Sequence, residues 1–99
     1  MIYLDEEQLN IVKEILKKHL PDRAVIVFGS RVTGKIKPYS DLDLCLMGGK
    51  PVSIAVLAHL KEAFSDSNLT IRVDVVDWAN ISPEFQAVIS EQSVSLSFI

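Results

Sequence analysis

Residues 27–47 read VFGSRVTGKIKPYSDLDLCLM and contain two different nucleotide-binding signals. The part from Gly29 to Lys35 matches G-x-x-x-x-G-K, which is most of a P-loop. Later in the stretch, Asp41 and Asp43 are two carboxylates at the spacing of one face of a strand. The two signals belong to different folds, so the choice between them decides how the rest of the chain is interpreted.

The residues after the lysine disfavour the P-loop interpretation. A P-loop needs Ser or Thr directly after Lys35 to hold Mg²⁺, and this chain has Ile36, which cannot ligate a metal. A helix should also begin at the lysine. Instead the residues KPYSD lead into the alternating segment DLDLCLM, which is typical of a strand.

The hydrophobic pattern predicts a single α/β (α+β) domain over residues 1–99. Capping signals at Asp5 and at Ser82-Pro83, and the helix breaker Pro21, mark helix ends. The pattern predicts helices over 6–20, 51–64 and 83–91, and strands over 24–28, 41–47 and 70–76. The last segment, 93–99, is either an edge strand or a docking tail. We expect a small mixed β-sheet with helices packed on one face.

Alternation along the strands predicts a cluster of carboxylates. Asp41 and Asp43 point to one side of their strand, away from the leucines between and after them. Asp74 shares a face with Arg72 in the third strand, opposite the apolar residues. If the apolar faces join one core, the three aspartates gather on the other side of the sheet. Such a cluster is costly without a cation, and Mg²⁺ is the natural one.

The start of the opening stretch supplies groups for a phosphate. Gly29 after a buried strand allows a tight turn and a close approach to a ligand. A short helix beginning at Ser30 would direct its free amides, and the serine hydroxyl, towards the carboxylates. Arg31 and Lys35 place positive charge nearby in an acidic chain. These groups suit a metal-bound nucleoside triphosphate.

At these residues the chain resembles the nucleotidyltransferases of the DNA polymerase β superfamily. Their motif is a hydrophobic residue, then Gly-Ser or Gly-Gly, a loop, Asp-x-Asp in a strand, and a distant third Asp. Here the motif stands as Phe28-Gly29-Ser30, Asp41-Leu42-Asp43-Leu44 and Val73-Asp74-Val75-Val76. The fuller pattern FGSRVTG…SDLDL…VDVVD is most similar to the minimal nucleotidyltransferase (MNT) domains of prokaryotes, over nearly the whole chain.

The resemblance implies a nucleotidyltransferase fold and transfer of a nucleoside monophosphate to a hydroxyl. It implies that Asp41 and Asp43 ligate two Mg²⁺ ions, that Asp74 completes the metal on the nucleophile side, and that Gly29 and Ser30 hold the triphosphate. We also expect Arg31 and Lys35 to contact the nucleotide, because their side chains are positively charged.

Minimal domains of this kind are similar to the antitoxin half of HEPN/MNT toxin–antitoxin pairs. The resemblance implies an enzyme, a protein adenylyltransferase, that moves AMP from ATP to a tyrosine hydroxyl of a HEPN-domain ribonuclease toxin. Two alternatives stay open. The chain could be a non-catalytic antitoxin that neutralises the toxin by binding, or a subunit of a small-molecule nucleotidyltransferase of the aminoglycoside-modifying kind.

Composition excludes several other classes. The net charge is −3, which argues against a broad nucleic-acid surface. Cys45 is the single cysteine, so a disulfide framework and a Cys-rich zinc site are excluded. The sequence has no apolar run of the ~18 residues that a membrane span needs. We therefore expect a cytoplasmic protein with no membrane partner.

Overall fold

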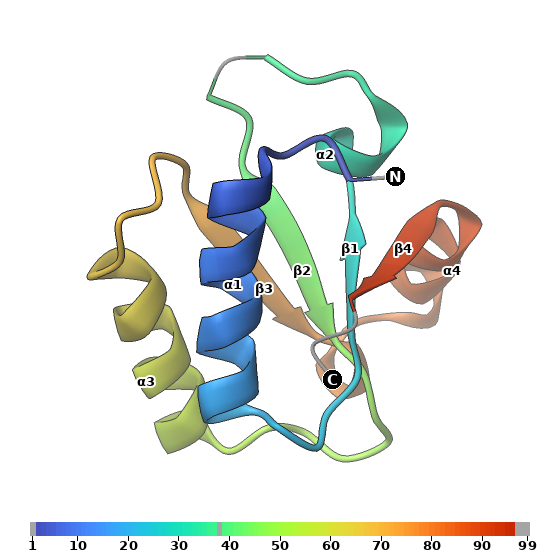
Figure 1. Ribbon diagram of the computed structural model, residues 1–99. Helices are drawn as coiled ribbons and strands as arrows, with labels where there is room; N and C mark the ends of the chain where they lie inside the picture. The colour runs from blue at the N-terminus through green and yellow to red at the C-terminus, as the bar shows by residue number, and fades with distance from the viewer. Residues whose placement is uncertain (1, 38, 97–99) are drawn as a thin grey trace.

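The computed structural model describes residues 2–37 and 39–96, and it confirms the mixed α/β architecture (Figure 1). One mixed sheet has the strand order β3-β2-β1-β4. Its strands are β1 (Val25–Phe28), β2 (Leu42–Leu46), β3 (Val73–Asp77) and β4 (Ser93–Leu96). The helices are α1 (Glu6–His19), α2 (Ser30–Thr33), α3 (Ile54–Ser65) and α4 (Pro83–Glu91), and a 3₁₀ turn spans Trp78–Asn80.

The helix ends follow the capping signals in the sequence. The Asp5 carboxylate accepts the Gln8 amide at 2.8 Å, and α1 begins at the next residue after Asp5. Ser82 caps α4, whose first residue is a proline. The predicted helix over 51–64 begins later, because the Ser53 side chain caps α3 and leaves Pro51 and Val52 in the preceding loop.

The strand pairing sets the position of the site. β1 pairs antiparallel with both β2 and β4, and β2 pairs in parallel with β3. The third strand begins at Val73 rather than at residue 70, because the residues before it form the bend after α3. β4 confirms the edge-strand alternative for the last segment over residues 93–96, and residues 97–99 lie outside the described chain.

The two faces of the sheet carry different side chains. One face presents the leucines and valines of β1, β2 and β3 to α1 and α3, and this side holds the main hydrophobic core (Figure 1). The short helix α4 lies over the other face, where its Phe85 ring packs edge-on against Phe28 with centroids 5.9 Å apart. The expectation that helices pack on one face therefore describes α1 and α3 but does not include α4.

The cover given by α4 has a physical reason. Ile26, Phe28 and Cys45 make the β1 side of this second face apolar, and Cys45 is fully buried. The β3 side of the same face is left open, and the Asp74 side chain there is exposed. Of the helices in the described ranges, none has the length and apolar character that crossing a membrane requires.

Candidate functional site

Three aspartates lie together on the open part of the sheet. Asp43 and Asp74 are direct partners in the parallel β2–β3 pair, so their side chains project side by side from the same face. Asp41 comes one residue before β2 and falls on this face by alternation. The structure thus brings Asp43 and Asp74 side by side on the predicted face, with Asp41 at the start of β2 on the same face.

The cluster is not electrically balanced. Burial of the Asp43 carboxyl raises its pKa from 3.8 to about 6, and the negative charges of Asp74 and Asp41 act in the same direction. A carboxyl that is both partly desolvated and next to two like charges favours a bound cation.

Gly29 brings the end of β1 against the cluster. Its φ of 78° and ψ of −156° belong to a region that only glycine adopts readily. A Cβ at this position would lie 3.2 Å from Asp43 Cγ and closer still to the carboxylate oxygen Oδ2. The helix α2 begins at the next residue, Ser30. The first backbone N–H groups of a helix have no partner within it, so those of α2 lie free beside the carboxylates.

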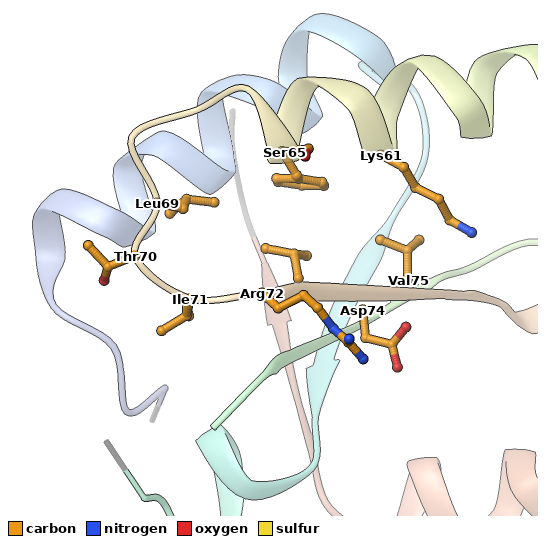
Figure 2. Close-up of a pocket in the computed structure, with 10 residues that line it drawn as sticks. Lys61, Ser65, Leu69, Thr70, Ile71, Arg72, Asp74 and Val75 are labelled. Carbon is orange, nitrogen blue, oxygen red and sulfur yellow. The ribbon is translucent and has the colours of Figure 1, made fainter. Parts of the chain in front are cut away.

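Arg72 is a site residue whose contact the sequence reasoning missed. Its guanidinium Nη2 lies 3.4 Å from the Asp41 carboxylate, and both side chains are substantially exposed. Arg72 projects from the same side of β3 as Asp74 (Figure 2). The signal that could have found this ion pair is the position of Arg72, two residues before Asp74 on the face that carries the carboxylates.

Two of the three aspartates, Asp43 and Asp74, lie side by side as two donors to one divalent metal would, and the third does not. Across residues 2–37 and 39–96, no group of three His, Cys, Asp or Glu side chains is arranged to hold an ion. The Asp41 carboxylate is instead paired with the Arg72 guanidinium. The chemistry still fits a hard cation, since Asp43 and Asp74 are adjacent oxygen donors.

The comparison with known protein families decides the class of this site. Residues 10–97 match the family described as polymerase beta, nucleotidyltransferase. The chain belongs to this nucleotidyltransferase family.

The relatives of this nucleotidyltransferase agree with the family. The "Probable protein adenylyltransferase MntA" of Haemophilus influenzae is 49% identical over 86 residues, which is 87% of this chain and 75% of that protein. A crystal structure of a toxin–antitoxin with AMP-PNP matches with a TM-score of 0.75 at 22% identity, over 92% of this chain and 73% of that one. A tri-AMPylated Shewanella oneidensis HEPN toxin in complex with its MNT antitoxin matches with a TM-score of 0.69 at 19% identity, over 97% and 74%. At these identities the two structures establish the fold.

Arg31 makes structural contacts that its position in the motif did not predict. The side chain is 7% exposed, and its guanidinium donates to the Ser40 carbonyl at 2.9 and 3.2 Å and to the Tyr3 carbonyl at 2.9 Å. Arg31 therefore ties the N-terminal segment and the end of the loop before β2 to α2. Its guanidinium is engaged by these carbonyls, so it positions the loop that leads to Asp41. A contact between Arg31 and a nucleotide stays a prediction.

Three further candidate groups are the exposed Lys35 and the buried Asp77 and Cys45. Lys35 lies in the exposed loop after α2, and the helix of a P-loop does not begin there. Asp77 is buried and accepts the Val52 amide at 2.6 Å, so it fixes the entry to α3 and is not part of the carboxylate row. Burial raises the pKa of the Cys45 thiol to about 11, which suits a packing residue and not a nucleophile.

The raised pKa of Asp43 predicts a stability effect with a definite sign. The folded protein holds this proton more tightly than the unfolded chain, so the stability from Asp43 falls as pH rises from about 4 to about 6 and stays low above that. Asp43→Asn removes the penalty. Allowing for solvent screening of a partly exposed group, we expect a gain of about 1 kcal/mol, or about 4–8 °C in Tm, at about pH 7.5 without metal.

The measurement is thermal unfolding by circular dichroism in EDTA at about pH 4 and about pH 7.5. Asp22→Asn, which changes an exposed aspartate in the turn before β1, is the matched control and should not change Tm at either pH. An Asp43→Asn gain of the same size at both pH values would show that charge repulsion is not its cause.

Proposed function

We propose that this nucleotidyltransferase is a protein adenylyltransferase that moves AMP from ATP to a tyrosine hydroxyl of a HEPN-domain toxin, and that it acts as the antitoxin of that toxin in the cytoplasm. The observation that carries the proposal is the row formed by Gly29, Asp43 and Asp74, in which a glycine turn lies directly against paired carboxylates. The name of the MntA relative and the AMPylated toxin of the structural neighbour support the choice of acceptor.

Asp41, Asp43 and Asp74 are the residues that would hold two Mg²⁺ ions. Two ions held there would supply positive charge to neutralise the triphosphate and the charge that develops on the reacting oxygens. Binding requires Asp41 to release Arg72. An exposed ion pair of this kind contributes about 0–1 kcal/mol, so the release costs little.

The chain's own residues orient the two reactants. The Ser30 hydroxyl and the first backbone amides of α2 would donate hydrogen bonds to the phosphates. The exposed Lys35 would contact the triphosphate from the loop after α2. Asp74 lies at the β3 end of the row and would receive the proton of the attacking hydroxyl. The hydroxyl oxygen forms a bond to the α-phosphorus, the bond from that phosphorus to the bridging oxygen breaks, and pyrophosphate leaves.

The proposal is tested by label transfer from α-³²P-ATP with Mg²⁺ to the product of the adjacent gene. The expected result is a labelled neighbour with the wild-type protein and none with Asp41→Asn/Asp43→Asn. An aminoglycoside added as a competing acceptor should stay unlabelled. Label on the aminoglycoside alone would overturn the protein acceptor, and an unlabelled neighbour that the double variant still neutralises would mean a binding-only antitoxin.

A further inference from the structure

A groove runs beside the candidate site along the outer edge of the sheet. We call it the β3-edge groove. It is lined by Lys61, Phe64 and Ser65 at the end of α3 and by residues 69–75, with a volume of about 490 Å³ (Figure 2). Asp74 lines this groove and also belongs to the carboxylate row. The groove is therefore continuous with the place where the acceptor hydroxyl must react.

The lining residues show that the groove runs along the outer edge of β3 and does not lie on either face of the sheet. Arg72 and Asp74 point to the carboxylate face, whereas Val73 and Val75 point towards α3, and all four line the groove. Among the described residues, β3 pairs with β2 alone and ends the sheet on this side. An open edge of this kind is a template for a further strand.

The backbone groups that face the groove can be assigned. The Leu42 amide of β2 donates to the Arg72 carbonyl at 2.9 Å, so the backbone of Arg72 faces β2. In a parallel pair the backbone N–H and C=O groups of successive residues alternate between the two sides of a strand, so the backbone groups of Asp74 also face β2. The N–H and C=O groups of Val73 and Val75 therefore point outwards, into the groove.

The wall of the groove is held in place from α1. The side-chain carbonyl oxygen of Gln8 accepts from the Thr70 amide at 3.3 Å and from the Thr70 hydroxyl at 3.1 Å. Ser67 closes the turn before it by donating its hydroxyl to the Phe64 carbonyl at 2.6 Å. Because these hydrogen bonds fix the loop between α3 and β3 near both of its ends, the groove has its shape before a ligand binds.

We propose that the β3-edge groove binds an extended segment of the acceptor protein, which pairs with the outward backbone groups of Val73 and Val75 and places its acceptor hydroxyl beside Asp74. The inference rests on the proposed adenylyl transfer to a protein. Strand addition to an open edge is an established mode of peptide recognition, in which backbone hydrogen bonds give affinity and alternate side chains give specificity.

The geometry specifies the sequence around the acceptor. A segment residue level with Asp74 projects from the carboxylate face, about 4.8 Å further along the row, where the hydroxyl is needed. The residues on either side of it project the opposite way, towards Phe64, Leu69 and Val75. The acceptor residue should therefore be flanked by apolar residues, and the exposed Lys61 lies at the rim to contact a carbonyl or carboxylate of the segment.

The first test is amide hydrogen exchange of the full chain, followed by NMR, with and without the product of the adjacent gene and in the absence of ATP. The Val73 and Val75 amides should exchange at least about tenfold more slowly in the complex. Unchanged exchange of both amides in a formed complex would overturn the inference, whatever the activity.

The second test separates the groove from the chemistry by kinetics. Lys61→Glu should raise KM for the acceptor protein about fivefold and leave KM for ATP unchanged. Lys18→Glu, which changes an exposed lysine near the C-terminal end of α1, is the matched control and should change neither value. A synthetic acceptor peptide should likewise lose labelling when its apolar flanks are replaced by aspartate.

The two tests distinguish the inference from the proposed function. Label transfer by the wild type with no amide protection and no change of KM in Lys61→Glu would overturn the groove alone. Protection of Val73 and Val75 without any label transfer would overturn the adenylyltransferase and keep the groove as a binding site.

Discussion

Asp43→Asn is expected to reduce AMP transfer to the acceptor protein by about three orders of magnitude, because several kcal/mol of charge stabilisation depend on this carboxylate. Asp43 is the central member of the row, with Asp74 beside it on β3 and Gly29 against it on the β1 side. The substitution keeps the size of the side chain and removes only its charge. The loss should therefore appear in kcat for label transfer from α-³²P-ATP.

Controls separate this loss from misfolding. The Asp43→Asn variant should melt no lower than the wild type without metal, because the repulsion within the carboxylate cluster is relieved, and its complex with the acceptor protein should still form. Asp66→Asn, in which an exposed aspartate at the end of α3 is changed, should retain wild-type kcat. Retention of more than about a tenth of the wild-type kcat in Asp43→Asn would refute the role given to this residue.

The sequence predicted the carboxylate face well because that prediction needs only the period of a strand. Alternation placed Asp43 and Asp74 opposite the leucines and valines, and parallel pairing in register then brought them together. The predicted turn at Gly29 was equally local, since a glycine between a buried strand and a short helix has few other reasons to be there. The structure adds the physical demand, which is the contact with Asp43.

The contacts that the sequence left undefined belong to long side chains, whose partners the spacing of a motif does not define. Arg31 was expected to contact a nucleotide because of its positive charge. It turns towards the Tyr3 and Ser40 carbonyls, and Tyr3 is distant in sequence. Arg72 was placed on the correct face, but its pairing with Asp41 depends on how β2 and β3 are offset.

The position of α4 also required tertiary information. The apolar residues Ile26, Phe28 and Cys45 share a face with the aspartates, and this face was expected to carry no helix because all helices were predicted on the other one. The structure divides that face into an apolar part covered by α4 and a polar part left open. Asp43 is the β2 partner of Phe28, so it lies where the apolar and the polar part of this face meet.

Gly29→Ala is expected to lower both activity and stability, and Gly49→Ala is its matched control. Alanine at position 29 meets two obstacles, a backbone with φ of 78° and a carboxylate of Asp43 in the space its Cβ would fill. The backbone strain costs about 1–3 kcal/mol, so Tm should fall by at least about 4 °C. At Gly49 an added Cβ has nothing within 4 Å, and Tm should stay within about 2 °C of the wild type.

The activity loss in Gly29→Ala should exceed what the stability loss explains. Relief of the overlap must move either the turn or the Asp43 carboxylate, and a displacement of about 1 Å in a reacting group can cost about 10²-fold in rate. The measurement is kcat and KM for ATP at a temperature where circular dichroism shows the variant to be folded. A folded Gly29→Ala protein with wild-type kcat would mean that the turn does not hold the triphosphate against Asp43, and the row of Gly29, Asp43 and Asp74 would then lose its place as the catalytic centre.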